Sequence, residues 1–450
     1  MGKVLSRRDK WTRNFMQTFS SQLVIMCVNL LSGVILSRGM GAEGRGQFIS
    51  ITMWSNLLYW ALSFGVYQAV LYFMKQHNGQ KNDIFRTFLV YTLITCIIAI
   101  VVAETIIVPL VTDGYDTGVI IAARIYFIGI VFAGFADILM ATLASEEKFG
   151  YSNILRMLIP GFTTLIMLVL FFLDILTAQT ALYTSFITSS CLFLVNVFKM
   201  INLKYIGGKV DWPLMWQAFK YGAKSHGGSV AGLASNNSSQ MTISVFLSSA
   251  SLGLYSTAQS SVSPLNTITS TIGITAQPML TAEEKNKVHL RVVEIIRKTA
   301  FVIGICSFVL ALLLPLAIPI VYGQEFTAAI IPALIILPSV MFNSISNTYR
   351  NALNGAGMTF INTKAEIIVL VFTAVFLFVF LSSWQLEGAA IATTLSSVVR
   401  CIIFYNEYRR RIYSISVIEM IPTWKDAKGI YASWVNLWNK RLNKATASKG

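Results

Sequence analysis

The sequence predicts an all-α polytopic membrane protein with about twelve transmembrane helices, arranged as two pseudo-symmetric six-helix bundles around a central cavity. Of the 450 residues, 55% are hydrophobic and 12% are charged, against roughly 25% charge in an ordinary soluble domain. Apolar stretches of about 20 residues, enough to cross about 30 Å of hydrocarbon, recur along nearly the whole chain. A soluble globular protein is therefore excluded.

Charge sets the expected orientation of these spans. The expected spans cover residues 15–37, 48–73, 87–110, 118–143, 153–173, 181–201, 225–247, 254–280, 299–322, 327–348, 365–383 and 387–406. With the N-terminus inside, alternation places 32 of the 35 Lys and Arg residues on the inner side, as cytoplasmic loops require. Both termini are predicted to be cytoplasmic in a bacterial cell membrane, and the net charge of +15 is a topology signal rather than a nucleic-acid footprint.

The order of the spans suggests a duplication. We expect an N-terminal lobe (1–202), a cytoplasmic amphipathic linker (203–222), a C-terminal lobe (223–408) and a tail (409–450) that forms either a basic amphipathic helix on the membrane or a solvated helix. Asp211 and Pro213 are residues typical of a helix start. Gly46 and Gly253, 207 residues apart, fall at corresponding outer turns, where glycine permits a positive φ or a close backbone approach.

Polar residues concentrate in the seventh and eighth spans. Amides and hydroxyls repeat there at helical spacing, and such groups must face other helices or water because hydrocarbon offers them no partner. They are either contacts for a polyhydroxylated ligand in a central cavity or polar links between helices. The candidate ligand contacts are Ser229, Asn236, Asn237, Gln240, Gln259, Ser263, Asn266, Ser270 and Gln277.

Charges near the membrane give further candidates. The candidate contacts for an anionic ligand are Arg38, Arg124, Lys224 and His226. Each is alternatively an interface anchor, and Arg124 is placed to pair with Glu104 across a hairpin. Asp137 is a candidate site for ion coupling, whereas Glu366 is expected to reach water at the inner end of its span.

Several motifs are missing from the sequence. There is no G-x-x-x-x-G-K-[ST] loop, so ATP hydrolysis is not expected. The five cysteines stand singly and the three histidines are far apart, so we expect no disulfide, metal site or cofactor. Without a large loop to hold catalytic groups, an enzyme such as a membrane glycosyltransferase is disfavoured, and a secondary transporter fits better.

Four segments together resemble the bacterial oligosaccharide and polysaccharide flippases of the multidrug/oligosaccharidyl-lipid/polysaccharide exporter superfamily. They are SRGMGAEGRGQF (37–48), YGAKSHGGSV (221–230) with LGLYSTAQS (252–260), IPIVYGQEFTAAIIPALIILPSV (318–340) and WQLEGAAIATTLSSVVRCIIFY (384–405). The resemblance implies two six-helix lobes around a cavity. It also implies a lipid-diphosphate-linked glycan as substrate. Many members carry Arg and Asp in the middle of span 7, where this chain has neutral amides.

The leading hypothesis is therefore translocation of a polyprenyl-diphosphate-linked oligosaccharide from the inner to the outer leaflet by alternating access. The expected partners are this substrate, membrane lipids, a polysaccharide polymerase and glycosyltransferases, with no nucleic acid. A lipid II flippase and a drug/cation antiporter of the same architecture are the alternatives. The absence of Asp and Glu from span 1 counts against the antiporter.

Overall fold

A computed structural model describes residues 2–76, 80–146, 149–203, 205, 207–282 and 285–422, and every regular element in these ranges is helical. The first part of the chain forms α1 (Gly2–Leu62), α2 (Val66–Gln76), α3 (Lys81–Val102), a π-helical turn η1 (Ala103–Ile107), α4 (Val108–Val111), α5 (Thr117–Ile128), α6 (Ile130–Ser145), α7 (Phe149–Phe172) and α8 (Ala178–Asn202). The second part forms α9 (Trp212–Phe246), α10 (Ser249–Ala282), α11 (Lys285–Tyr322), η2 (Gln324–Ala329), α12 (Ile330–Gly355), α13 (Phe360–Arg411) and η3 (Val417–Met420).

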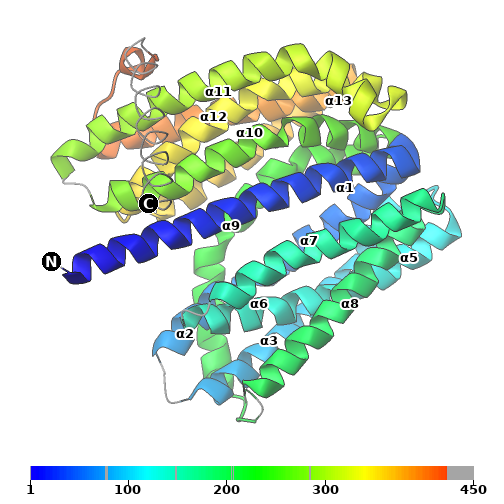
Figure 1. The fold of residues 1–450 in the computed structure, drawn as a ribbon, viewed down its shortest axis with the longest axis horizontal. Coiled ribbons are helices and arrows are strands. Elements are labelled where there is room, and N and C mark those ends of the chain that lie inside the picture. Colours follow the sequence, from blue (N-terminus) through cyan, green and yellow to red (C-terminus); the bar gives the residue numbers. More distant parts are fainter. Residues whose placement is uncertain are drawn as a thin grey trace, which may run out of the picture.

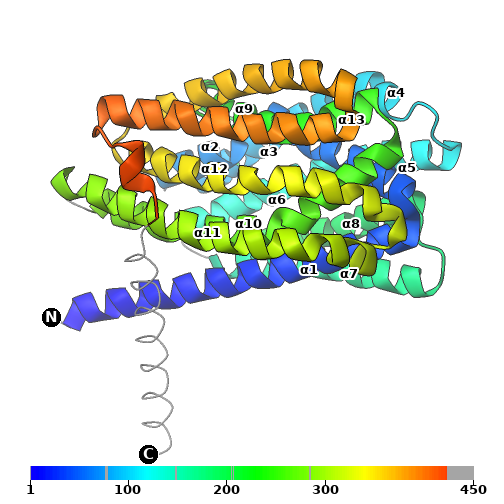
Figure 2. The same ribbon diagram turned by 90° about the horizontal axis from the view of Figure 1, so that it is seen from above.

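All twelve predicted spans lie on these helices, which confirms the all-α class. Figure 1 shows α2 to α8 gathered in one lobe and α10 to α13 in the other, with the long first part of α1 between them. Figure 2, seen from above, shows that most helices share one direction. Seven described segments are long and apolar enough to cross a membrane, and two of them, Gln22–Gln76 and Phe360–Arg411, are long enough to cross twice. The chain is therefore a multi-pass membrane protein.

Gly41 divides α1 into two spans. Its φ of 66° is favourable only for glycine and breaks the helix there. The carboxylate of Glu325 in η2 accepts a hydrogen bond from the backbone N–H of Ala42 (2.8 Å), so a side chain from the other lobe caps the restarted helix. The prediction that Gly46 and Gly253 fall at outer turns was wrong, because the chain is helical at both glycines and the single bend at Gly41 suffices. A second bend, at Trp384 and Gln385, divides α13 in the same way.

Gly46 and Gly253 hold the two lobes together by backbone contact. A Cβ on Gly46 would lie 1.7 Å from the carbonyl oxygen of Ser249, and a Cβ on Gly253 would lie 1.9 Å from that of Ala42. Ala42 and Gly46 are four residues apart in α1, and Ser249 and Gly253 are four residues apart in α10. The 207-residue offset of the internal repeat relates Ala42 to Ser249 and Gly46 to Gly253. The contact is thus reciprocal, as across a two-fold axis. We call this end of the bundle the crossing end.

The other end of the bundle, with residues 203–221, is called the linker end here. The Asp211 carboxylate accepts a hydrogen bond from the N–H of Leu214 (2.9 Å), which confirms the predicted helix start. No separate linker helix forms, because α9 continues unbroken to Phe246. Figure 1 shows the first, green part of α9 crosswise to the other helices. Trp212 and Trp216 are exposed there, in the manner of aromatic residues at a membrane interface.

The reciprocal glycine contact can be tested by adding one methyl group. Gly46→Ala and Gly253→Ala should each cost about 1–3 kcal/mol of stability, because backbone atoms that cannot rotate away block the new Cβ. The measurement is thermal unfolding of the purified protein in detergent. Gly304→Ala is the matched control, because no atom lies within 4 Å of its Cβ position. Equal stability in all three variants would show that the backbones do not approach here.

Candidate functional site

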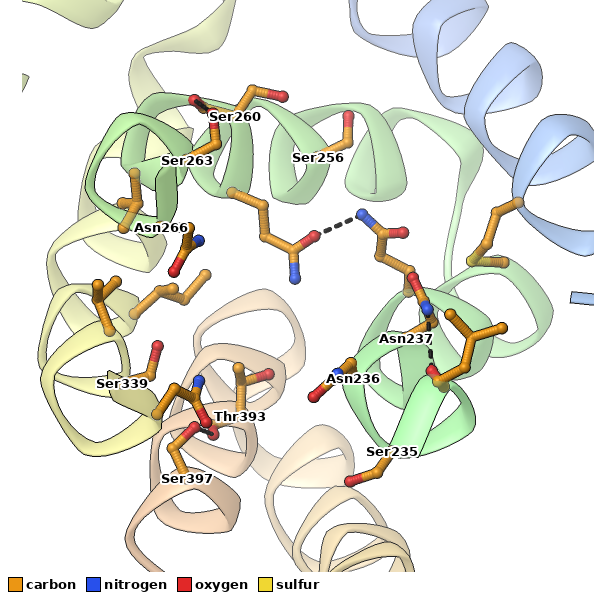
Figure 3. A pocket seen from close by; sticks show the side chains of 18 of the residues that line it. Ser235, Asn236, Asn237, Ser256, Ser260, Ser263, Asn266, Ser339, Thr393 and Ser397 are labelled. Atoms are coloured by element: carbon orange, nitrogen blue, oxygen red, sulfur yellow. Dashed lines mark hydrogen bonds between the residues drawn. The ribbon is translucent and has the colours of Figure 1, made fainter. Parts of the chain in front are cut away.

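A cavity of about 920 Å³ lies between the lobes, lined by side chains from α1, α9, α10, α12 and α13. Figure 3 shows labelled side chains from several helices around this shared space. The lining includes nine amides, and it also carries many hydroxyls. The amides are Asn29, Asn56, Asn236, Asn237, Gln240, Gln259, Asn266, Asn343 and Asn347. The hydroxyl-bearing residues are Thr52, Ser235, Ser256, Ser260, Ser263, Thr269, Ser270, Ser339, Thr393, Ser396 and Ser397.

The polar stripes predicted on spans 7 and 8 meet in this cavity. Of the nine candidate contacts, seven are among its lining residues: Asn236, Asn237, Gln240, Gln259, Ser263, Asn266 and Ser270. The Gln240 amide donates a hydrogen bond to Gln259 (2.6 Å), which joins α9 to α10 across the cavity wall (Figure 3). Two adjacent amides with further donors and acceptors around them are suited to bind hydroxyl groups. Ser229 is exposed outside the lining, and the Gln277 side chain lies outside the described residues.

Some polar side chains of the lining are used by the protein itself. The Asn237 amide donates to the carbonyl of Leu233 (2.9 Å), and the Ser263 hydroxyl donates to that of Ser260 (2.8 Å). The Thr393 hydroxyl of the lining lies 2.7 Å from both the Ser239 and the Tyr255 hydroxyls behind it, which links α13 to α9 and α10. Some polar groups of the two stripes therefore join helices while others face the cavity, and the contact of the latter with a ligand stays a prediction.

Arg38, a predicted anion contact, lies at the crossing end and not in the cavity. Its guanidinium donates to the carbonyls of Val321 (2.9 Å) and Ile320, which satisfies the C-terminal end of α11. Arg45, which is 1% exposed, donates to the hydroxyls of Ser256 (3.1 Å), Ser260 (3.0 Å) and Ser37 and to the Gly33 carbonyl. Both arginines thus bridge the lobes beside the reciprocal glycine contact.

Arg124 and His226, two further predicted cationic contacts, also lie outside the cavity lining. Arg124 pairs with Glu104 (3.5 Å) on the surface of the N-terminal lobe, so the structure has the ion pair and not the cavity-facing arrangement. The His226 ring nitrogen lies 2.6 Å from the Trp60 carbonyl and its ring stacks on the indole, which ties α9 to α1. The Lys224 side chain lies outside the described residues.

Asp137, the candidate for ion coupling, lies inside the N-terminal lobe. The Tyr59 hydroxyl donates to its carboxylate (2.5 Å). Tyr59 lines a second, smaller cavity of about 230 Å³, and Asn56 lines both cavities. The two cavities are therefore adjacent at Asn56, and the smaller one reaches the tyrosine that binds Asp137. Its role in coupling stays a prediction.

Sequence reasoning missed the charged part of the cavity. Arg350, Glu366 and Arg400 are its three charged lining residues. Glu366 was expected to reach water, but its side chain is only 5% exposed and lies 3.6 Å from Arg350 Nη1 and 3.3 Å from Arg400 Nη2. Arg350 and Arg400 had been counted among the inner-side anchors. The signal in the sequence was the spacing of Asn343, Asn347 and Arg350 and of Thr393, Ser397 and Arg400, at steps of four and three residues.

Two lobes that enclose a polar cavity within a multi-pass membrane protein are the arrangement that transporters of the alternating-access type have. Known structures agree. The chain is similar to the lipid II flippase MurJ in an inward closed conformation (TM-score 0.69, 14% identity, covering 88% of this chain and 87% of that one). It is also similar to a MATE family multidrug resistance transporter of the MOP superfamily in an inward-facing conformation (0.68, 14%, 88% and 98%). A third is a MOP superfamily transporter from Pyrococcus furiosus (0.59, 14%, 88% and 95%).

At these identities the likeness shows the fold. The family comes from the sequence profile described as polysaccharide biosynthesis protein, which matches residues 35–331. The chain belongs to this polysaccharide biosynthesis protein family. A search of curated proteins finds no match.

The pair between Glu104 of η1 and Arg124 of α5 should stabilise the hairpin that these elements form. In a double-mutant cycle with Glu104→Gln and Arg124→Gln, we expect a coupling energy of about 0.5–1 kcal/mol, as is usual for partly exposed polar pairs. Unfolding in detergent measures it, and translocation by each variant should match the parent protein. If the effects of the two single substitutions on stability are additive, the two side chains do not interact. If Arg124→Gln alone abolishes transport, Arg124 contacts the substrate.

Proposed function

We propose that this protein moves a polyprenyl-diphosphate-linked oligosaccharide from the cytoplasmic to the outer leaflet of a bacterial cell membrane for cell-surface polysaccharide biosynthesis. The two lobes alternate between access from one side and access from the other. The glycan lies in the cavity while the polyprenyl chain stays in lipid. The proposal includes no chemical step, since the substrate leaves the protein unchanged.

One observation carries the proposal: the cavity is lined mainly by neutral amides and hydroxyls, within a family named for polysaccharide biosynthesis. A sugar presents many hydroxyls and no charge, so amides that donate and accept at once match it well. The volume of about 920 Å³ lies near the upper end of the roughly 300–1,000 Å³ usual for small-molecule sites.

The drug/cation antiporter alternative has less support. Arg350, Arg400 and Glu366 are the charged lining residues, so the described cavity wall has a net charge of +1 when all three are ionised. A cationic drug would be repelled from such a wall, while an anionic lipid headgroup would be attracted to it. A lipid II flippase shares the substrate chemistry of the proposal, and the two differ in the glycan.

In the proposed orientation the linker end faces the cytoplasm. Lys75, Lys81 and Lys209 lie there, together with Arg409, Arg410 and Arg411 after the last span. The cavity lining of the second part of α1 runs from Ile49, next to the lobe contact, to Trp60 near the linker end. This supports a conformation that is shut at the crossing end, with the cavity extending toward the cytoplasm. A polymerase and glycosyltransferases are proposed as partners on the two sides.

Topology is tested with reporter fusions. Alkaline phosphatase, which is active only outside the cytoplasm, should be inactive when fused after residue 210 and active after residue 113 or 385. A green fluorescent protein fusion, which folds only in the cytoplasm in this setting, serves as the reciprocal control at each site. The opposite pattern at any of the three sites would overturn the orientation.

The sugar site is tested by removing two amides. In proteoliposomes with a polyprenyl-diphosphate-linked oligosaccharide, Gln240→Ala combined with Asn266→Ala should slow translocation at least about tenfold, the effect of losing one or two hydrogen bonds. The matched control is Asn202→Ala combined with Gln324→Ala, which removes the same side chains from exposed positions outside the cavity. An unchanged rate in the cavity variant contradicts the assignment, and lipid II as a parallel substrate separates the two glycan classes.

A further inference from the structure

The cavity contains a buried carboxylate between two arginines. Glu366 lies on the first part of α13, Arg350 on α12 and Arg400 on the second part of α13, so three separate spans meet at this point. The two carboxylate oxygens of Glu366 face different arginines, at 3.6 Å and 3.3 Å. Both distances exceed the roughly 2.7–2.9 Å of a strong charge-assisted hydrogen bond. Glu366 therefore bridges the two cations loosely and does not bind either one in a bidentate manner.

Neutral groups hold the arginines in place independently of Glu366. Arg400 donates from Nη1 to the Asn343 amide oxygen (2.8 Å) and from Nη2 to the Ser235 hydroxyl (3.0 Å). Arg350 donates from Nη2 to the Asn347 amide oxygen. These partners come from α9 and α12, and so both guanidinium groups would stay in position if the carboxylate moved aside. Such fixed, planar donors favour bidentate binding of phosphate groups.

The charges of Arg350, Glu366 and Arg400 do not cancel. One carboxylate faces two guanidinium groups, which leaves a net charge of +1 in a membrane-embedded cavity. The Arg350 side chain is still 39% exposed, whereas those of Glu366 and Arg400 are 5% and 10% exposed. Arg350 is thus the member of the cluster that an entering ligand meets first. A diphosphate linked at both ends carries two negative charges, which match two arginines once the carboxylate is displaced.

We infer that Arg350 and Arg400 form the binding site for the diphosphate of the lipid-linked substrate, with Glu366 as the internal anion that occupies this site when it is empty. The inference rests on the proposed function and names the headgroup contact of the same cavity. Glu366 lowers the cost of keeping two cations, one of them buried, inside the cavity without substrate. It also competes with the diphosphate and so favours release after the lobes have rocked, because a site without a competing anion would hold its substrate too tightly.

Binding of a short polyprenyl diphosphate tests this inference without any glycan. Farnesyl diphosphate should bind the purified full-length protein in detergent, and farnesol should bind at least about tenfold more weakly. Arg350→Gln and Arg400→Gln should each weaken farnesyl diphosphate binding about tenfold or more, and Glu366→Gln should strengthen it about tenfold. Arg411→Gln is the matched control, since Arg411 is on the same helix and pairs with Glu407 (2.8 Å) outside the cavity.

The double variant Arg400→Gln with Glu366→Gln guards against misfolding, because it removes opposite charges together. It should unfold at the temperature of the parent protein, and it should bind farnesyl diphosphate less well than Glu366→Gln alone. Wild-type affinity in the arginine variants, or unchanged affinity in Glu366→Gln, overturns the inference. Equal binding of farnesol and farnesyl diphosphate to the parent protein would also overturn the inference.

Transport separates this inference from the proposed function. In proteoliposomes the tighter-binding Glu366→Gln should translocate a lipid-linked oligosaccharide more slowly than the parent protein, because release is impaired. If the parent protein translocates the glycan while the arginine variants bind farnesyl diphosphate normally, only the inference fails. If the predicted order of binding is found but the parent protein translocates no lipid-linked glycan, the diphosphate site stands and the proposed function fails.

Discussion

The backbone contact between α1 and α10 is the constraint on which the rest of the arrangement depends. Gly46 and Gly253 bring two helices of different lobes so close that no side chain fits between them. This approach places Arg45 and Arg38 within reach of groups on the other lobe, and it lets Glu325 cap the helix that restarts after Gly41. The large cavity begins immediately beyond the contact. Separation of the lobes at this end would therefore have to break the polar contacts of Arg38, Arg45 and Glu325 as well as the backbone contact.

The cavity wall divides its chemistry between helices. α9 and α10 supply most of the neutral amides that we assign to the glycan, whereas α12 and α13 supply the charged cluster that we assign to the diphosphate. Ser235 of α9 and Asn343 of α12 both contact Arg400, so the two regions share hydrogen bonds. Binding of a ligand with a neutral and an anionic part would therefore involve four helices of one lobe together with α1. With such a ligand bound, the lobes would be joined by more contacts than they are when the cavity is empty.

The sequence predicts the architecture well because hydrocarbon imposes simple rules on length and charge. The helical spans and the polar stripes of spans 7 and 8 follow from single-helix patterns. The close backbone approach at Gly46 and Gly253 follows from their match at an offset of 207 residues, although both lie in helices and not in turns. The charged cluster does not, because Arg350, Glu366 and Arg400 belong to three spans, and only their packing shows that they meet. Each was read singly as a residue near the inner membrane surface. For the same reason Arg38 was interpreted as a substrate contact, although the α11 carbonyls that it binds lie 282 and 283 residues away.

The polarity of α9 and α10 has a consequence for how the chain enters the membrane. Neither helix is among the seven described segments that are apolar enough to span hydrocarbon by themselves. Partition of either one alone would leave amides and hydroxyls in lipid without partners. The two helices must therefore enter together or against spans already in place, with Gln240 and Gln259 satisfying each other and Trp54 of α1 bonded to Ser244. The two helices to which we assign the glycan are thus also the part of the chain whose insertion depends most on earlier helices.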